Sequence, residues 1–597
     1  MRKKWMSLLL VAAMVVTACT QGTGETAQNK VAEGSGIGDD LYKNPVVSEK
    51  EVPIYYNSLD NEDTVSLAFL NDNDDLPYIS LDAWKDVLIK IHREGYNDDN
   101  QKDLDYNIEL STDGDEAVYT RDNSYTLTFD FAKDTMDFLD FDGFFQASNQ
   151  TDLITLAELN DSDDDILKYE KVLDGYNRYG KEIVLNLADY DIHLIKSKDQ
   201  YYAPLQTLGD FLISMMYINV FYNGKEVMIT SSGNFKDDET NELSEMGDVY
   251  YAEQKEERSE ALSEFSYNEL CLVMDSLYGL KEIHGIDRFD DLFVETGLKY
   301  RLTDPDPSVA DEALFELIDL HLDDLHSSFD YPSWMVGEPS WSMERYGTTY
   351  NRFITAARKY LAARREYYPD GCPGYEEVGN TAYITFDHFL ATDDDVDYYG
   401  KDTPSEDSED TIGLLIYAYE QIMRKGSPVE NVVMDLSNNL GGSATTAVYA
   451  IGMFLGESTD SIENSFSGAR MTNYYALDTN LDGKFNKKDT LAGKGLKFYC
   501  LISPVSFSCG NLVPCVFKYS DEVTLLGKTS GGGACAVLPL STAYGTAFSI
   551  SGYIRLSYSK NGAFYDIDQG AEPDYIISDP KNFYDRKALT DYINGLY

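Results

Sequence analysis

The sequence predicts a multidomain α+β protein whose C-terminal part is an α/β domain. With 597 residues, the chain is longer than the ~100–200 residues of a typical single domain. Hydrophobic residues make up 43% of it and aromatic residues 13%, which is enough apolar material for several cores. Strand-like and helix-like segments alternate from Gly374 onward, and this alternation is typical of an α/β domain.

The first 18 residues have the layout of a secretory signal. Positive residues at 2–4 precede a short apolar run, Leu8 to Val16, and small residues precede Cys19. This ending is similar to the lipobox of bacterial lipoproteins, and the resemblance implies cleavage before Cys19 and diacylation of its side chain. An ordinary signal peptide with a chance cysteine is the alternative. Because two acyl chains hold a protein firmly on a bilayer, we expect a lipid-anchored protein at the outer face of the bacterial cell membrane.

Residues 19–50 are rich in small and polar residues, and they carry too little apolar surface to offset the entropy of ordering. We therefore expect them to form a tether. No later segment has the ~20 apolar residues that a transmembrane helix needs. The formal net charge of −56 excludes nucleic acid as a partner, because like charges repel.

Residues 51–235 are predicted to form an α+β region with an internal repeat. Leu76–Leu88 and Tyr201–Leu212 share the pattern Tyr-x-x-Leu-x-x-apolar-x-Asp-apolar-Leu. In each copy a strand-like run precedes the pattern, and apolar residues at helical spacing follow it. Residues 236–263 are highly charged and are predicted to be a linker, whereas residues 264–370 are predicted to be mostly helical. We expect a binding or spacer role for the repeat-bearing region.

Residues 371–597 are predicted to form the α/β domain. Apolar residues at helical spacing predict helices over 410–425 and 444–455. The predicted strands are rich in Val, Ile, Tyr and Phe. They cover residues 381–386, 431–436, 496–503, 522–526, 546–550 and 554–559.

Two of these strands lead into turns that suit catalysis. The strand at 431–436 is followed by a polar turn and then by Gly441 and Gly442, where backbone N–H groups can approach a ligand closely. A purely structural turn is the alternative. The strand at 496–503 is followed by Ser508, in the turn that opens the next helix. Its hydroxyl is either exposed, as in a nucleophile elbow, or used to cap the helix.

Two further motifs complete a series. A glycine-rich loop occupies residues 527–534, and Asp568 precedes a Gly-x-x-Pro-Asp sequence at 570–574. In order and spacing, the four motifs resemble the C-terminal processing (tail-specific) and tricorn-like serine peptidase family over roughly residues 376–580. The resemblance implies a ClpP/crotonase-like core, a peptide or protein substrate, an acyl-enzyme mechanism and no catalytic cofactor.

The resemblance also assigns roles. It implies that Ser508 is the nucleophile and that backbone N–H groups of Gly441, Gly442 and Cys509 form the oxyanion hole. Two positions depart from the family pattern, because Ser437 replaces an Arg and Asn511 replaces a Glu.

A serine nucleophile needs a base, and the Lys that many family members carry in the glycine-rich loop is absent. Asp324-Leu325-His326-Ser327 resembles the Asp-x-His-Ser/Thr turn of the tricorn-like branch, which implies that His326 is the general base. Asp568 is then the expected acid that orients the imidazole, directly or through Ser327. Lys528 is the alternative base.

Residues 478–489 match the twelve-residue calcium loop. Oxygen ligands fall at positions 1, 3, 5, 9 and 12, Gly483 stands at position 6, and position 7 contributes its carbonyl. We expect a structural Ca²⁺ that fixes an insertion, with a solvated polar loop as the alternative. The expected ligands are Asp478, Asn480, Asp482, Lys484, Asn486 and Asp489.

Six cysteines follow Cys19, and they lack the spacing of a metal site. We expect buried free thiols, and a disulfide remains the alternative. Together, these features predict a membrane-tethered extracytoplasmic serine endopeptidase. A catalytically inactive peptidase fold that binds peptides or cell-surface components is the first alternative, and a surface adhesion or scaffold protein is the second.

Overall fold

The computed structural model describes residues 42, 45–71, 73–95, 107–145, 167–169, 176–237, 240, 242–390, 396–400, 402–406, 410–560 and 563–596. The signal segment at 1–18, Cys19 and the tether as far as residue 41 lie outside the described residues. Among the helices of the described ranges, none is both long and apolar enough to cross a membrane.

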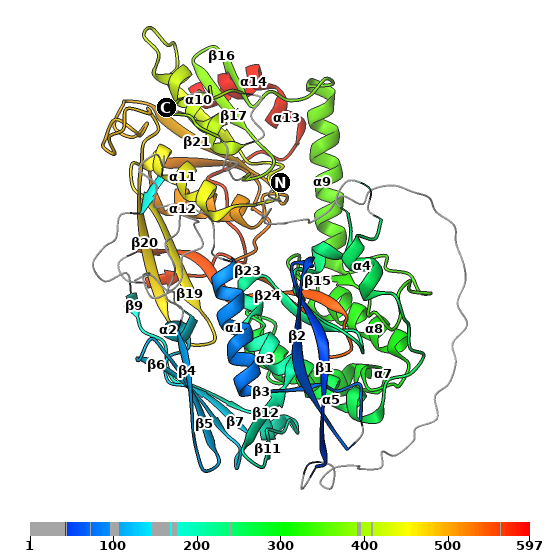
Figure 1. The fold of residues 1–597 in the computed structure, drawn as a ribbon. Coiled ribbons are helices and arrows are strands. Elements are labelled where there is room, and N and C mark those ends of the chain that lie inside the picture. The colour runs from blue at the N-terminus through cyan, green and yellow to red at the C-terminus, as the bar shows by residue number, and fades with distance from the viewer. Residues whose placement is uncertain are drawn as a thin grey trace, which may run out of the picture.

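The first sheet contains both copies of the repeat (Figure 1). It consists of β11 (Ile195–Ser197), β12 (Gln200–Pro204), β3 (Tyr78–Ser80), β2 (Ser58–Leu70), β1 (Val47–Tyr56), β14 (Val227–Thr230) and β13 (Asn219–Tyr222), in this order. In one copy β3 leads into α1 (Leu81–Gly95), and in the other β12 leads into α3 (Leu205–Leu212). Because β3 and β12 pair antiparallel, the two copies meet within one sheet.

A second, antiparallel sheet lies beside the first. Its order is β10 (Ile183–Asn186), β7 (Thr135–Phe138), β6 (Tyr125–Asp130), β5 (Glu116–Arg121) and β4 (Ile108–Asp113). Short helices accompany the two sheets. These are α2 (Phe141–Phe145), η1 (Leu187–Tyr190), η2 (Ser214–Met216) and η3 (Ser232–Phe235).

The boundaries of the N-terminal region differ from the prediction. Residues 236–263 are not only a charged linker, because they contain α4 (Glu245–Tyr250), whose Tyr250 is buried and stacks on Phe235. The many acidic residues around α4 hid this short helix in the sequence. Two strands of the region, β8 (Leu167–Tyr169) and β9 (Tyr176–Arg178), pair with a strand of the C-terminal part. The N-terminal region is therefore joined to the rest of the molecule by shared sheet structure.

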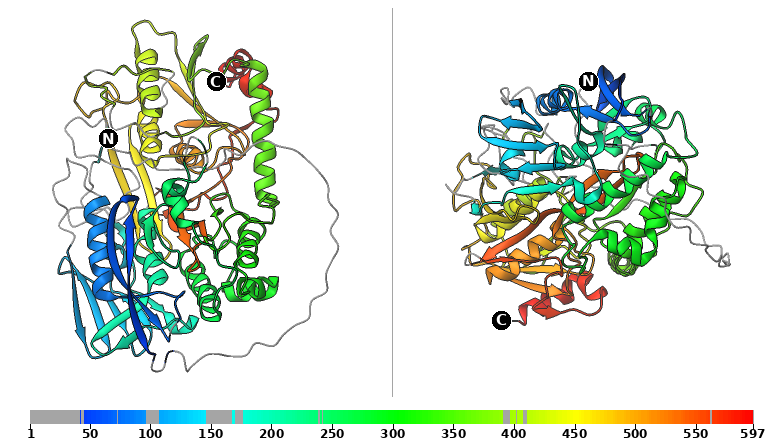
Figure 2. Two further views of the ribbon diagram at one scale, coloured as in Figure 1. Left: turned by 45° about the vertical axis from the view of Figure 1, so that its right-hand side comes forward. Right: turned by 90° about the horizontal axis from the view of Figure 1, so that it is seen from below.

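The middle segment is helical, as predicted, except for one strand. Its elements are α5 (Glu260–Leu277), α6 (Phe289–Thr296), α7 (Leu298–Leu302), α8 (Pro307–Glu316), the π-helix η4 (Leu317–Leu322), the strand β15 (Ser328–Tyr331) and α9 (Thr348–Tyr367). The long helix α9 runs from this segment to the C-terminal part (Figures 1 and 2). Arg364 near its end forms two hydrogen bonds with Asp387, at 2.6 and 2.5 Å. This fork-to-fork pair fixes α9 on the C-terminal part.

The C-terminal part contains the α/β domain that the sequence predicts. Five parallel strands, β17 (Thr381–Thr385), β18 (Asn431–Asp435), β21 (Lys497–Ile502), β22 (Val523–Gly527) and β26 (Tyr575–Ile576), follow the antiparallel edge strand β16 (Tyr375–Val378). The helices are α10 (Thr411–Met423), α11 (Ala444–Leu455), α12 (Cys509–Ser520), α13 (Lys581–Tyr584) and α14 (Arg586–Asn594). The predicted helices at 410–425 and 444–455 are confirmed as α10 and α11.

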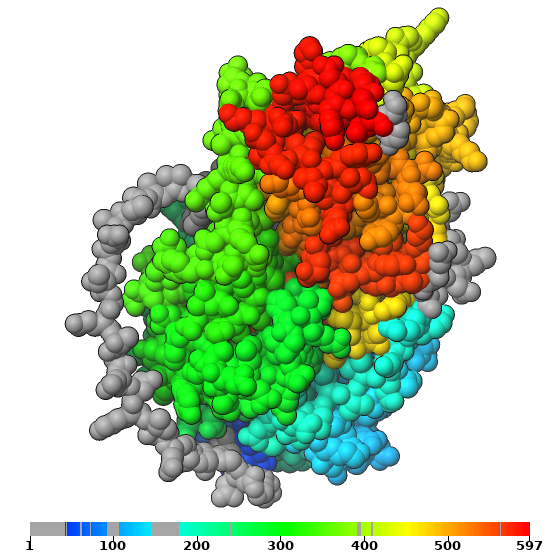
Figure 3. All heavy atoms as spheres, turned by 180° about the vertical axis from the view of Figure 1, so that it is seen from behind, coloured from blue at the N-terminus to red at the C-terminus, as the bar shows by residue number. Residues whose placement is uncertain are grey.

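A further sheet combines strands from all three regions. Its path is β15, β24 (Ala547–Lys560), β19 (Ser458–Asn464), β20 (Arg470–Leu477) and β8, and β23 (Cys535–Ser541) and β25 (Ala563–Tyr565) pair with β24. The two strands predicted at 546–550 and 554–559 are one continuous strand, β24. Because β15 pairs with β24, the turn that carries His326 is attached to the C-terminal part. In Figure 3 the helical segment, in green, packs along the orange and red C-terminal part.

Candidate active site

The first feature of the site is the backbone of Ser508. Ser508 lies between the end of β21 and the start of α12, with φ +55° and ψ −124°. A non-glycine residue avoids this conformation unless its surroundings impose it, and nucleophile elbows use such strain to expose a hydroxyl. The Ser508 side chain makes no capping hydrogen bond to α12. The capping interpretation is therefore wrong, and the role of Ser508 as nucleophile stays a prediction.

The Gly-Gly turn lies directly against Ser508. Because β18 and β21 are adjacent and parallel, the turns after their carboxyl ends meet. A Cβ atom on Gly441 would lie 2.6 Å from the Ser508 Cβ and 3.1 Å from its Oγ. Gly441 also has φ +100° and Gly442 has φ +135°. Both the contact and the backbone conformation therefore require glycine at position 441.

The expected oxyanion donors differ in their availability. The Gly441 N–H donates to Asn439 Oδ1 at 2.9 Å in a local turn, so the prediction that it serves as a free donor is corrected. The Gly442 N–H faces the Cys509 thiol, which is a weak acceptor. The Cys509 N–H makes no hydrogen bond to another described residue. The two donors that remain for an oxyanion are those of Gly442 and Cys509.

The glycine-rich loop holds the nucleophile turn in place. The Ser508 N–H donates to the Gly532 carbonyl at 3.0 Å, and the Gly531 N–H donates to the Ser506 carbonyl at 2.7 Å. Asn511 ties the third and fourth motifs together, because its Oδ1 accepts from the Ser530 hydroxyl at 2.7 Å and its Nδ2 donates to the Ile567 carbonyl at 2.8 Å. The residue that departs from the family's Glu therefore has a structural function here.

The other departure from the family pattern, Ser437, also takes part in hydrogen bonds. The Ser437 hydroxyl lies 3.0 Å from the Tyr584 hydroxyl, and the two can share a hydrogen bond. Ser437 is buried, and its carbonyl accepts from the Ser503 hydroxyl at 2.6 Å. Ser437 thus joins the turn after β18 to α13 and to the end of β21.

His326 lies next to the nucleophile turn. It is only 4% exposed, and its ring packs on Phe507, the residue before Ser508, with ring centroids 4.6 Å apart. Burial lowers the pKa of His326 to about 4, against the opposing effect of Asp324. At neutral pH the imidazole is therefore uncharged, as a general base must be.

Asp324 is a site residue that the sequence interpretation missed. Its Oδ1 accepts from the backbone N–H groups of His326 and Ser327 at 3.0 and 2.9 Å and from the Ser551 hydroxyl at 2.7 Å. Its Oδ2 accepts from the hydroxyls of Ser327 at 2.7 Å and Tyr278 at 2.9 Å. One buried carboxylate thus fixes the turn that carries His326 to α5 and β24. The sequence feature that could have identified Asp324 was its position two residues before His326.

Asp568 does not take the position that the sequence predicts. Its Oδ1 accepts from the Ala534 N–H at 3.2 Å, and among the described residues it makes no hydrogen bond to His326 or Ser327. The Ser327 hydroxyl is already bound to Asp324, a carboxylate of its own turn. Burial raises the pKa of Asp568, and the charges of Asp566 and Asp324 raise it further. The expected link from Asp568 to the imidazole is therefore corrected.

Lys528, the alternative base, lies at the start of the glycine-rich loop. Its backbone N–H donates to the Ile502 carbonyl at 3.0 Å, and its ammonium group has no hydrogen bond to another residue of the described ranges. His326 remains the base that the geometry favours.

The predicted calcium loop connects β20 to β21. Gly483 has φ +70°, which suits the sharp turn at position 6 of such loops, and its N–H donates to Asp478 Oδ2 at 2.7 Å. Asp478 and Asp489 are buried. Burial raises the pKa of Asp489, and the nearby charges of Asp478 and Asp482 raise it further. A cation would relieve this repulsion, and the all-oxygen donor set suits Ca²⁺.

Some polar groups of the same loop form hydrogen bonds with one another. Asn480 Nδ2 donates to Asp489 Oδ1 at 2.5 Å, and Asn486 Nδ2 donates to the Lys484 carbonyl at 2.7 Å. Within the described ranges, no group of three or more His, Cys, Asp and Glu side chains is arranged to hold a metal ion. Calcium binding by this loop therefore stays a prediction.

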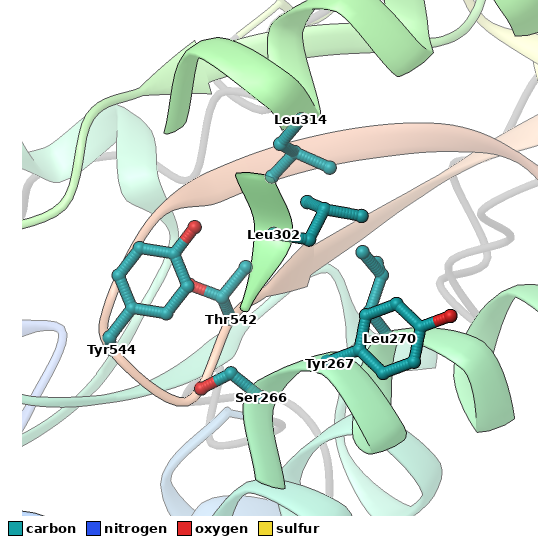
Figure 4. A pocket seen from close by; sticks show the side chains of 7 residues that line it. All are labelled: Ser266, Tyr267, Leu270, Leu302, Leu314, Thr542 and Tyr544. Atoms are coloured by element: carbon teal, nitrogen blue, oxygen red, sulfur yellow. The ribbon is translucent and has the colours of Figure 1, made fainter. Parts of the chain in front are cut away.

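A small cavity lies away from these motifs (Figure 4). It lies among α5, the end of α7, α8 and the turn between β23 and β24, and it is lined mainly by leucine and tyrosine side chains. None of its lining residues belongs to the turns that carry Ser508, His326 or Gly441. The cavity is therefore a packing defect beside the helical segment and not part of the site.

The six described cysteines are free, which confirms the expectation of free thiols. Five are buried, and burial raises their pKa values, so these thiols are unreactive.

The fold and the site together define the class of this protein as a serine-type peptidase. Residues 380–577, about a third of the chain, match Peptidase family S41. The match confirms the family resemblance that the four motifs predicted. It covers the strands, the Gly-Gly turn, Ser508 and the glycine-rich loop, whereas His326 lies before it.

Solved structures show more distant similarity. A protein of Parabacteroides merdae is 16% identical, with a TM-score of 0.39 and coverage of 57% of this chain and 96% of that one. A lipoprotein from Streptococcus agalactiae is 14% identical, with a TM-score of 0.34 and coverage of 56% and 96%. Mature CPAF complexed with lactacystin is 11% identical, with a TM-score of 0.35 and coverage of 56% and 97%. No curated protein matches the chain.

Proposed function

We propose that this chain is a membrane-tethered, extracytoplasmic endopeptidase that cleaves peptide or protein substrates through an acyl-enzyme at Ser508. The observation that carries the proposal is the strained Ser508 backbone at the start of α12, packed against Gly441. His326, buried against the neighbouring Phe507, supplies an uncharged base beside the same turn. These are the parts that acyl transfer requires.

The proposed reaction has two halves. Ser508 Oγ forms a bond to the substrate carbonyl carbon, and its proton moves to the His326 imidazole. The N–H groups of Gly442 and Cys509 stabilise the negative charge on the carbonyl oxygen. The imidazolium then protonates the leaving amine as the peptide bond breaks. Water hydrolyses the acyl-enzyme by the same proton route and regenerates the serine.

Asp324 is the proposed supporting carboxylate. It holds the His326 turn through two backbone N–H groups, and it lies close enough to stabilise the imidazolium that forms during the reaction. Its link to Tyr278 and Ser551 keeps this turn attached to both α5 and β24.

The experiment is labelling of the full chain, in detergent, with a fluorophosphonate probe that reacts with activated serines. We expect wild-type labelling that is lost in Ser508→Ala and in His326→Ala. Ser520→Ala is the matched control, because Ser520 lies at the other end of α12. Its hydroxyl donates to the Phe517 carbonyl and accepts from the Glu522 N–H, both within its own turn. Absence of labelling in folded wild type would favour the inactive, peptide-binding alternative.

The proposed tether is tested separately. The lipobox-like ending at Cys19 supports lipid anchoring, so Cys19→Ala should release the protein from the membrane fraction. Cys372→Ala, which changes a thiol within the folded part, is the control and should stay in that fraction. A Cys19→Ala protein that still sediments with membranes would contradict the anchor.

The loop at 478–489 supports a second proposal, that a structural Ca²⁺ fixes the segment between β20 and β21. The proposed ligands are those predicted from the sequence. The ion would have no part in the chemical steps, because the loop is separate from the turns that carry Ser508 and His326.

A further inference from the structure

Phe507 contacts three segments of the candidate site and the helix α9. Its backbone N–H donates to the Asn439 carbonyl at 3.0 Å, just before the Gly-Gly turn. Its backbone pairs with Gly532 of the glycine-rich loop. Its ring contacts His326 on one side and Phe353 of α9 on another, with centroid distances of 4.6 and 6.0 Å.

The ring of Phe507 has little freedom to move. It is 7% exposed, and a Cβ atom on Gly533 would lie 2.6 Å from its Cε2. The glycine therefore leaves just enough space for the ring. Since the backbone on both sides is also hydrogen-bonded, the ring is held before any substrate arrives.

The His326 imidazole, in contrast, lacks a polar partner that could orient it. Its backbone N–H is held by Asp324, but its ring nitrogens make no hydrogen bond to another described residue. Among the described residues, the aromatic ring that packs on this imidazole is that of Phe507, inclined at 54°. In a triad of the usual kind, a carboxylate accepts from the imidazole and fixes it.

We propose that Phe507 is a positioning residue for catalysis, whose ring orients the His326 imidazole and excludes water from it. The inference rests on the proposed function, because it needs His326 to act as the base for Ser508. An aromatic ring can do this by shape, since it blocks the rotamers that would turn the imidazole away from Ser508. It also covers the imidazole, and burial is the main cause of the lowered pKa of His326.

The charged and titratable groups on the other sides of His326 remain in place when Phe507 is changed. Asp324 belongs to the same turn and raises the pKa of the imidazole. The groups around Asp324 are Tyr278, which directly follows α5, Cys535 of β23 and Asp568 of the segment after β25. Arg555 of β24 and Asp566 lie next to Cys535 and Asp568. A shift of the pH profile in a Phe507 variant therefore reports on the ring itself.

The test is the pH dependence of the fluorophosphonate labelling rate between pH 4 and 8, measured on the full chain. Phe507→Leu is expected to move the acid limb upward by at least one pH unit, toward the ordinary range of histidine, and to lower the rate at pH 7 at least tenfold. Phe353 packs on the ring of Phe507, so Phe353→Leu should shift the acid limb in the same direction by a smaller amount. Phe517→Leu is the matched control, because Phe517 is a fully buried ring of α12 that packs on Phe454 and not on His326.

The outcomes separate this inference from the proposed function. Labelling of wild type that is lost in His326→Ala, with an unshifted acid limb in Phe507→Leu, would overturn the role of Phe507 alone. Failure of wild type to label would overturn both. If Phe507→Leu does not fold, the Phe353→Leu variant is the test. An acid limb of Phe353→Leu that is identical to that of Phe517→Leu would then overturn the inference.

Discussion

The backbone N–H of Ser508 donates a 3.0 Å hydrogen bond to the carbonyl oxygen of Gly532. Gly532 occupies the loop position at which the family resemblance implies a lysine in many members. In this chain the glycine-rich loop holds the turn at Ser508 by its backbone, and the proposed base, His326, lies in a separate segment. The site therefore depends on the docking of the helical segment onto the C-terminal domain.

Gly441→Ala should abolish labelling of Ser508 without unfolding the protein. The new Cβ would lie 2.6 Å from the Ser508 Cβ, and alanine also disfavours φ +100°. Displacement of the oxyanion turn is expected to lower the rate by about 10²-fold or more. Gly426→Ala is the control, because Gly426 has φ +83° with no atom near its Cβ position. Equal losses in both variants would contradict a specific contact with Ser508.

Asp324→Asn should slow labelling at least tenfold more than Asp568→Asn. An asparagine cannot accept hydrogen bonds at both positions, so it loses bonds from the Ser327 or Tyr278 hydroxyls. Each hydrogen bond to a buried charge contributes about 1.5–3 kcal/mol, so a lower melting temperature should accompany the loss. Labelling rates and melting curves of both variants measure this. A larger loss in Asp568→Asn would restore the sequence-based choice of Asp568.

Removal of calcium should lower the stability of the wild type. If the loop at 478–489 binds Ca²⁺, an ion concentration of 100 times Kd adds about 2.7 kcal/mol to the free energy of unfolding. Thermal unfolding with calcium and with a chelator measures the difference. Asp478→Asn should remove it, whereas Asp521→Asn, an exposed acid of the same domain with a left-handed backbone, should keep it. A chelator-insensitive wild type would refute the calcium proposal.

Stability should fall as pH rises through the neutral range because of two carboxyl groups between α3 and α5. Asp210 and Glu269 are 3% and 2% exposed, and burial raises both pKa values, that of Glu269 to about 8. Above its ordinary pKa of about 4.5, an unfolded Glu releases its proton while the folded one keeps it. The contribution of Glu269 to stability is thus complete below about pH 4.5 and is lost as pH rises through about 8, by at most about 1.4 kcal/mol per pH unit. Asp210 acts in the same direction.

Glu269→Gln should flatten this dependence, because the amide does not titrate. Denaturant unfolding at pH 5, 7 and 9 measures the slope. Glu260→Gln is the control, since Glu260 is exposed in the first turn of the same helix and should leave the slope unchanged. An equal slope in wild type and Glu269→Gln would show that the buried pair does not control it.

The sequence by itself determined the α/β character of the C-terminal part and the order of its motifs, and it singled out Ser508 as the proposed nucleophile. These features depend on local patterns. Apolar spacing predicts α10 and α11, β-branched and aromatic runs predict the strands, and glycine pairs mark turns where a Cβ atom cannot fit. The repeat was visible for the same reason, although its two copies were not predicted to pair with each other through β3 and β12.

The tertiary structure alone decided which groups surround His326, the proposed base. Sequence spacing could not show that Ser327 bonds to Asp324 and not to Asp568, because Asp568 lies more than two hundred residues further along the chain. Nor could it show that Asn439 occupies the Gly441 N–H, or that Phe507 packs on His326. These hydrogen bonds and ring contacts form because β15 pairs with β24 and because α9 packs on the C-terminal part. Such long-range contacts leave no periodic signal in the sequence.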